Sequence, residues 1–147
     1  RLKSAYIVKC ESFTKDESGN ILEVHCTYIP ESKSGSDSSG INVKGTIHWV
    51  SAANAAFAEV RLYDRLFTNE NPLAVEGDFK DTINPNSLQI IAKAVIEPSL
   101  KQANFDNRYQ FIRKGYFCLD KDSTPDNLVF NRTVTLKDAW VKEVKKT

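Results

Sequence analysis

Residues 42–67 read "NVKGTIHWVSAANAAFAEVRLYDRLF" and contain the strand pattern on which the prediction of the fold depends. Side chains alternate between the two faces of a strand, which places Val60 and Leu62 on one face and Arg61 and Tyr63 on the other. The first face is largely apolar, while the second alternates guanidinium groups with aromatic rings. Such a face is typical of a seam between two packed layers, or of a surface where arginines bind phosphate and rings stack on bases. A strand with large side chains on both faces is usually buried on both sides, so we interpret this strand as structural. We expect the carboxylate of Asp64 to pair with a nearby arginine.

The composition of the chain is that of a globular protein. Its 147 residues are 41% hydrophobic and 27% charged, enough for one ordinary domain or for two small barrels that share an interface. The net charge of +1 excludes a strong overall basic field, so a nucleic-acid site must be a local cluster of lysines and arginines. No apolar run reaches the roughly 18 residues of a membrane span, so no membrane partner is expected.

The chain contains three cysteines, Cys10, Cys26 and Cys118, with no C-x-x-C pair. An odd number of widely spaced cysteines argues against a disulfide framework and favours a reducing compartment, which we take to be the cytoplasm. Cys10 and Cys118 lie in apolar runs, where we expect small buried thiols. The chain has no methionine and begins within a strand-like pattern, so we expect a piece of a longer protein.

Segments rich in β-branched and aromatic residues recur along the chain, separated by turn residues. A Ser/Gly-rich loop without apolar period is expected over 30–42, a helical turn over 79–83 and a short basic tail with a last helical turn over 137–146. Many short strands at near-regular spacing predict an all-β barrel or sandwich and exclude a doubly wound sheet. The expected strands cover residues 5–13, 21–29, 43–50, 58–67, 88–96, 108–119 and 128–136.

No catalytic or metal-binding motif is evident. His25 and His48 each lie within an expected strand and have no cysteine or carboxylate at ligand spacing, so we interpret both as structural. His25 and Cys26 are neighbours on a strand and point to opposite faces, which prevents the hydrogen bond of a nucleophile and its base. A thiol hydrolase of another kind remains an alternative.

The stretch "RYQFIRKGYFCLD" over 108–120 repeats the combination of cations and rings. It places Gln110, Arg113 and Lys114 among aromatic side chains, and Gln and Arg can bond base edges or phosphates. The same pattern fits a hydrophobic strand with one solvated face, and the residues alone leave both interpretations open. Arg1 and Lys3 share one face of the first segment, which alone indicates a solvated edge.

Six blocks follow one another in the order found in the C-terminal anticodon-binding region of glutaminyl-tRNA synthetases, which this chain resembles over nearly its whole length. They are "VKGTIHWVSA", "EVRLYDRLF", "INPNSL", "EPSL", "QFIRKGYFCLD" and "FNRTVTLKDAW". The resemblance implies two tandem six-stranded antiparallel β-barrels, similar to the ribosomal-protein barrel that binds 5S RNA, with the first truncated at its N-terminus. Residues 1–47 and 131–147 would form the proximal barrel and residues 48–130 the inserted distal one. The equivalent domain of archaeal and eukaryotic glutamyl-tRNA synthetases is the nearest alternative, and a protein-interaction barrel is an alternative of another class.

The resemblance also implies a division of labour in a longer enzyme. In this class I family the chemistry belongs to a separate catalytic domain, and the chain has neither its His-x-Gly-His motif nor a Met-Ser-Lys loop. We therefore expect the chain to be non-catalytic and to hold no cofactor, with ATP and Mg bound by the parent enzyme's catalytic domain. The expected partners are the anticodon loop of the glutamine tRNA, tRNA(Gln), whose second and third bases are U and G, and that catalytic domain. The enzyme is expected to be monomeric.

The family's anticodon contacts carry over to four positions. By resemblance, Arg1 contacts the first anticodon base, and Lys3 assists there in place of an arginine, with a point charge instead of a planar fork. Gln110 and Arg113 hold the central U, while the readers of the third base lie upstream of this chain. Residues three apart face opposite ways on a regular strand, so a shared base requires the chain to turn or bulge near Ile112.

Overall fold

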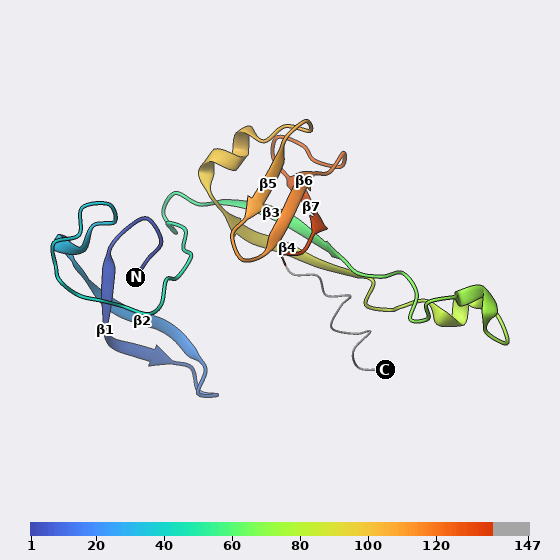
Figure 1. Ribbon diagram of the computed structural model, residues 1–147, viewed down its shortest axis with the longest axis horizontal. Coiled ribbons are helices and arrows are strands. Elements are labelled where there is room, and N and C mark those ends of the chain that lie inside the picture. Colours follow the sequence, from blue (N-terminus) through green and yellow to red (C-terminus); the bar gives the residue numbers. More distant parts are fainter. Residues whose placement is uncertain (137–147) are drawn as a thin grey trace. The chain divides into compact units, whose positions relative to one another are not determined.

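The computed structural model describes residues 1–136 and divides the chain into two compact units, Arg1–Trp49 and a second that begins at Val50 (Figure 1). Strands and short 3-10 helices make up both units, with no α-helix among the described residues. The all-β prediction is thus confirmed. The strands form a two-stranded and a five-stranded sheet and are not closed into one barrel.

The first unit is built on an antiparallel hairpin of β1 (Ile7–Lys15) and β2 (Ile21–Ile29). Its turn is organised by Asp16, whose carboxylate accepts hydrogen bonds from the backbone N–H groups of residues 18 and 20 at 2.9 and 2.8 Å. These hydrogen bonds, with that of the Asn20 side chain first among them, lower the pKa of Asp16. The predicted hairpin is confirmed. It was predictable because turn residues and β-branched flanking residues favour the same local structure.

Ser32 closes the open end of this hairpin. It ends the 3-10 helix η1 (Pro30–Ser32) and is completely buried. Its hydroxyl accepts a hydrogen bond from the Ile7 backbone N–H and donates one to the Ile29 carbonyl, both at 2.7 Å. The loop over 30–42, expected from its composition to lack an apolar period, thus contains a buried polar side chain that joins the ends of β1 and β2.

The strand predicted over residues 43–50 is wrong. The only pairing described there is an isolated parallel bridge between Leu2 and Ile47. The ladder stops because its partner segment turns away: Ser4 has a φ of 57°, and the Ala5 N–H donates to the Leu2 carbonyl at 3.1 Å. The β-branched residues of this segment had no neighbouring strand long enough to pair with.

The second unit contains a five-stranded sheet in the order β4-β3-β7-β6-β5. Strands β3 and β7 are parallel, and the other neighbouring pairs are antiparallel. Its strands are β3 (Ala56–Tyr63), β4 (Leu88–Ile96), β5 (Arg108–Phe111), β6 (Gly115–Leu119) and β7 (Leu128–Val134). Its 3-10 helices are η2 (Pro72–Ala74), η3 (Phe79–Thr82), which confirms the predicted helical turn, and η4 (Pro98–Gln102).

One face of the five-stranded sheet carries the hydrophobic core. Phe130 of β7 is fully buried and packs with Val60 of β3 and Phe117 of β6. The even positions of β3 point into this core, as the alternation predicted. The buried cluster consists of Ala56, Ala58, Val60, Ile96, Phe117, Leu119, Leu128 and Phe130.

Arg61 on the other face of β3 has a structural role. Its Nε lies 2.6 Å from a carboxylate oxygen of Glu59, and one terminal nitrogen lies 2.8 Å from Asp122. The hydrogen bonds to Asp122 and Glu59 raise the pKa of the Arg61 guanidinium above its ordinary value. The interpretation of this strand as structural fits these contacts, because the guanidinium is already bound by carboxylates.

The alternation does not continue to the end of the quoted stretch. Strand β3 ends at Tyr63 rather than at Phe67, and Asp64 lies beyond it, where its carboxylate accepts a hydrogen bond from the Arg65 backbone N–H at 2.8 Å. Phe67 instead forms an isolated bridge with Ile83. The strand ends there because its neighbour β4 begins at Leu88, the partner of Tyr63.

The prediction of a buried Cys10 is also wrong. Cys10 and Cys26 are both exposed, and Cys118 is half-buried. A two-stranded sheet presents both of its faces, so an apolar sequence run in β1 does not become a core. The helical turn expected over 137–146 lies outside the described residues, and the assignment of residues 131–147 to a proximal barrel stays a prediction.

Within residues 1–136 no helix has the length and hydrophobicity that crossing a membrane requires. The same residues contain no grouping of three or more His, Cys, Asp or Glu side chains able to hold a metal ion.

Removing the Ser32 hydroxyl should destabilise the first unit. Ser32→Ala leaves the buried Ile7 N–H and the Ile29 carbonyl without this partner, at a cost of about 1–3 kcal/mol in free energy of unfolding. Urea denaturation measures the loss. Ser38→Ala, at an exposed position of the same loop, is the matched control and should change stability by less than about 0.5 kcal/mol. Equal effects of the two substitutions would contradict the assigned role.

Candidate nucleic-acid interface

The segment that carries Gln110 and Arg113 is a hairpin rather than one continuous strand. Strand β5 ends at Phe111, the chain turns, and β6 begins at Gly115. The Lys114 N–H donates to the Phe111 carbonyl at 2.8 Å and closes the turn. The single strand expected over 108–119 is therefore wrong at its centre. The structure does contain the turn near Ile112 that contact of Gln110 and Arg113 with one base requires.

Strand β5 points its aromatic side chains inward and its polar ones outward. Tyr109 and Phe111 pack on the core, with the Phe111 ring stacked on Phe117 at a centroid distance of 4.2 Å. Gln110 faces the other way, is exposed, and lies opposite Tyr116 of β6. Within the described residues no hydrogen bond of the Gln110 amide side chain occurs. This donor and acceptor pair is available to a ligand.

Arg108 shares the outward face of β5 but is engaged by its own loop. Its guanidinium donates to the carbonyls of Phe105 and Asn107, both at 3.0 Å. Two outward side chains of the same short strand thus differ in availability. The amide of Gln110 is open to a ligand, whereas the Arg108 guanidinium already holds the loop that precedes the strand.

Arg113 occupies a backbone conformation that residues with side chains rarely adopt. Its φ is 64°, inside the left-handed region. Such a conformation costs on the order of 1–3 kcal/mol and persists only where the surroundings impose it, often at binding sites. Across residues 1–136 the exposed guanidinium has no ion pair or hydrogen bond. The strained turn therefore presents a cation at the tip of the hairpin.

Gly115 explains how the turn can lie so close to β7. Its φ is 140°, and an added Cβ would lie 2.5 Å from the Val134 carbonyl oxygen and 3.1 Å from the Arg132 side chain. Any residue other than glycine would collide with the backbone of β7 and strain its own. Gly115 thus fixes the start of β6 and, with it, the place of the preceding turn.

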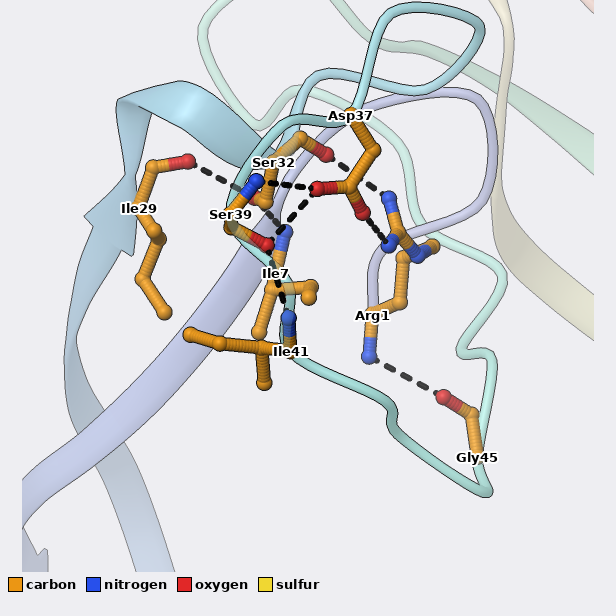
Figure 2. Close-up of polar contacts among 8 residues, drawn as sticks. All are labelled: Arg1, Ile7, Ile29, Ser32, Asp37, Ser39, Ile41 and Gly45. Atoms are coloured by element: carbon orange, nitrogen blue, oxygen red, sulfur yellow. Dashed lines mark hydrogen bonds and ion pairs between the residues drawn. The ribbon is translucent and has the colours of Figure 1, made fainter.

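Arg1 lies in the first unit and is bound from within that unit (Figure 2). Its guanidinium donates to the Ser32 carbonyl at 2.7 Å and forms an ion pair with Asp37. Its amino group donates to the Gly45 carbonyl at 3.0 Å. The Arg1 side chain keeps only 20% exposure. Arg1, which is predicted to contact the first anticodon base, is thus already part of a hydrogen-bond network within the first unit.

Sequence reasoning missed Asp37, the partner of Arg1. Its carboxylate accepts hydrogen bonds from the backbone N–H and hydroxyl of Ser39 at 2.9 and 2.7 Å, as Figure 2 shows. The bond from the Ser39 hydroxyl, then that from Arg1, then that from the Ser39 backbone N–H lower the pKa of Asp37 to about 2. The Asp-x-Ser pattern signalled a local turn. Nothing in the sequence pointed to a partner 36 positions away.

Lys3 is the exposed cation beside Arg1. Its backbone is fixed on both sides, because its N–H donates to the Ile47 carbonyl at 2.9 Å and its carbonyl accepts a hydrogen bond from the Trp49 indole at 3.0 Å. Its ammonium group makes no ion pair within residues 1–136. A fixed backbone and an open side chain suit a point-charge contact.

The four predicted contact residues fall into two sets. Gln110 and Arg113 belong to one hairpin of the second unit, and Arg1 and Lys3 flank the Leu2 bridge of the first unit. The structure keeps three of these side chains, those of Lys3, Gln110 and Arg113, without internal bonds in the described part of the chain. Arg1 is the exception.

Comparison with known proteins identifies relatives of the whole chain. A family model described as "tRNA synthetases class I (E and Q), anti-codon binding domain" matches residues 46–120. The chain is 56% identical over 143 residues to a glutamine–tRNA ligase of Vibrio parahaemolyticus, and 54% identical over 142 residues to that of Proteus mirabilis. Each match covers 97% of this chain and 25% of the relative. A ligase of the same name from Cupriavidus taiwanensis is 51% identical over 144 residues, with 97% and 24% covered. The chain spans about a quarter of the length of these relatives.

Substituting Gly115 should destabilise the second unit through its contact with β7. Gly115→Ala places a Cβ 2.5 Å from the Val134 carbonyl oxygen, and we expect a loss of about 1–3 kcal/mol in free energy of unfolding. Gly77→Ala is the matched control, because Gly77 also has a positive φ but an added Cβ would lie 3.9 Å from its nearest neighbour, the Asp81 carboxylate. Chemical denaturation of both variants separates the collision from the backbone strain. A loss at Gly115 no larger than that at Gly77 would contradict the steric explanation.

Protonation of Asp37 should loosen the first unit at low pH. Because folding lowers the pKa of Asp37 to about 2, its contribution to stability is present above the unfolded value of about 4 and is lost as the pH falls toward 2. Asp37→Asn removes this contribution, so its stability should vary less between pH 4 and pH 2. Thermal unfolding across this range measures the difference. An Asp37→Asn variant whose stability varies with pH as much as that of the wild-type chain would contradict this role of the carboxylate.

Proposed function

Because the chain belongs to the anticodon-binding domains of the class I synthetases for glutamate and glutamine, we propose that it binds the anticodon loop of the glutamine tRNA. In this proposal Gln110 and Arg113 hold the central U, and Arg1 and Lys3 act at the first base. The high identity to glutamine–tRNA ligases over 97% of the chain favours the glutamine tRNA over the glutamate tRNA.

The observation that carries the proposal is the turn between β5 and β6. It presents an amide and a guanidinium, three positions apart, without internal partners in the described part of the chain, and it holds Arg113 at a φ of 64°. Unstacked anticodon bases offer their Watson–Crick edges to such groups. The turn removes the difficulty that Gln110 and Arg113 would face opposite ways on a straight strand.

Arg1 would act on the first base in a different manner. A guanidinium has five N–H donors, and the bonds to Ser32 and Asp37 use only some of them. The internal bonds would hold the plane of the group, so that its remaining donors would bind a ligand with little loss of side-chain entropy. Lys3 would add a charge that neutralises phosphate or approaches the same base.

The proposal extends to the longer protein. That protein would attach glutamine to its tRNA in the cytoplasm, as a monomer, with ATP and Mg held by a catalytic domain outside this chain. Residues 1–47 and 131–147 would belong to the proximal anticodon-binding barrel and residues 48–130 to the distal one. Recognition of the third base would come from upstream residues.

The test is binding of an anticodon stem-loop that carries CUG, compared with the same loop in which the central U is replaced. We expect preference for U, and a loss of about 1–3 kcal/mol in binding free energy for Gln110→Ala and for Arg113→Ala. Affinity should fall as salt rises, because phosphate contacts release counterions. Fluorescence anisotropy at two salt concentrations measures both effects.

Matched controls separate recognition from folding and from charge. Gln102→Ala and Lys80→Ala remove an exposed amide and an exposed cation elsewhere in the second unit and should keep the preference for U. Arg113→Gly relieves the positive φ, so it should keep or raise stability by up to about 1 kcal/mol while weakening RNA binding. Binding unaffected by both site substitutions would overturn the assignment of these residues. Absence of any salt-sensitive RNA affinity would favour a protein-interaction barrel, and an equal preference for a glutamate anticodon loop would favour the glutamyl family.

A further inference from the structure

Two cysteines face each other across the β1–β2 hairpin. Cys10 of β1 and Cys26 of β2 are direct partners in the antiparallel register, at the end of the regular ladder that begins with Ile7 and Ile29. Residues directly opposite in such a pair project to the same face of the sheet. The two thiols therefore lie side by side, although they are 16 positions apart in the sequence.

The spacing of such a pair fits a disulfide. Directly opposite residues of antiparallel strands have Cα atoms about 4.5 or 5.5 Å apart, depending on whether the pair is hydrogen-bonded. Both values fall within the range of about 4.4–6.8 Å that disulfides span. A bulge interrupts the ladder directly after Cys10, so the strands are less constrained on that side of the pair.

The surroundings leave both thiols free and open to reagents. Cys10 and Cys26 are free and exposed. The Cys10 thiol lies 3.7 Å from the Ser12 carbonyl, a weak contact that a new bond would replace. Cys118, the third cysteine, is half-buried in β6 and lies opposite Arg108 of β5 and Asn131 of β7, with no cysteine as a strand neighbour.

We propose that Cys10 and Cys26 form a reversible cross-strand disulfide on reaction with a low-molecular-weight disulfide such as oxidised glutathione. One protein thiolate attacks the glutathione disulfide and releases one glutathione thiol, which leaves a mixed disulfide on the protein. The second thiolate attacks the protein sulfur of that mixed disulfide and releases the second glutathione. The protein dithiol is oxidised by two electrons, and one glutathione disulfide is reduced to two thiols.

The bond would act on the smaller of the two sheets described for residues 1–136. An isolated two-stranded hairpin is marginally stable, and exposed apolar residues such as Phe13 and Val24 lie on the same face as the cysteines. A covalent link between β1 and β2 reduces the conformational freedom of the hairpin when it opens. Ser32 joins the open end of the hairpin, at Ile7 and Ile29, and its carbonyl binds Arg1. Oxidation of the hairpin would therefore also stabilise the backbone that binds Arg1.

The experiment exposes the chain to excess oxidised glutathione at pH 8, blocks the remaining thiols by alkylation, and counts them by intact mass under denaturing conditions. The number of alkylated thiols should fall from three to one. After subtraction of the one alkyl group, the monomer mass should be lower by two hydrogen atoms. Dithiothreitol should restore three thiols. Peptide mapping of the wild-type chain should join Cys10 to Cys26. Limited proteolysis should cut the hairpin more slowly in the oxidised chain.

Variants provide the control. Cys26→Ser and Cys10→Ser should each stop at the mixed disulfide with glutathione, whereas Cys118→Ser should still lose both of its thiols. Because the linkage is read by peptide mapping of the wild type, misfolding of a variant does not affect the result. Any of four results would overturn the proposal. They are three thiols that persist after oxidation, glutathione that stays bound to the wild-type hairpin, a disulfide to Cys118, and a disulfide-linked dimer.

Discussion

The buried ring of Phe130 is the contact on which the second unit depends. It lies in β7, between the β3–β4 pair on one side and the β5–β6 hairpin on the other. Its ring packs against Tyr109 at a centroid distance of 5.8 Å and against Phe111 at 5.4 Å. These inward rings fix the direction of β5, and the polar residue between them must therefore face outward. The position of the candidate base reader thus follows from aromatic packing in the core.

Local patterns in the sequence were sufficient for many of the elements. The hairpin of β1 and β2 and the strand β4 follow from β-branched residues between turn signals, with the bounds of β2 and β4 as predicted. The alternation around Val60 and Arg61 identified the core face of β3. The strand expected over 43–50 failed because strand formation needs a partner, and the backbone turns at Ser4 before the partner segment can extend. Pairing between distant segments, including the parallel contact of β3 with β7, carries no local signature.

For the candidate site, the sequence predicted the residues and one turn but not their hydrogen bonds. The carry-over of Gln110 and Arg113 to one base, together with the geometry of strands, implied a turn or bulge near Ile112, and the structure contains a turn there. The internal engagement of Arg1 was not predictable, because its partner Asp37 lies in a loop whose composition indicates only a turn. The availability of Gln110 compared with that of Arg108 also depends on loop carbonyls that no residue pattern reports. Residue type identified the candidate side chains, whereas hydrogen bonds to other segments determine which of these side chains already have internal partners.

The parallel pairing of β3 with β7 has a consequence for how the second unit is made. Position 58 pairs with position 128, and all of β4, β5 and β6 lie between them in the sequence. Contacts between such distant segments require closure of a long loop before they stabilise anything, which slows folding. During synthesis β3 must wait, with the edge that pairs with β7 open, until nearly the whole unit has been translated. An unpaired edge of this kind is prone to aggregation, and β7 protects it by pairing with β3.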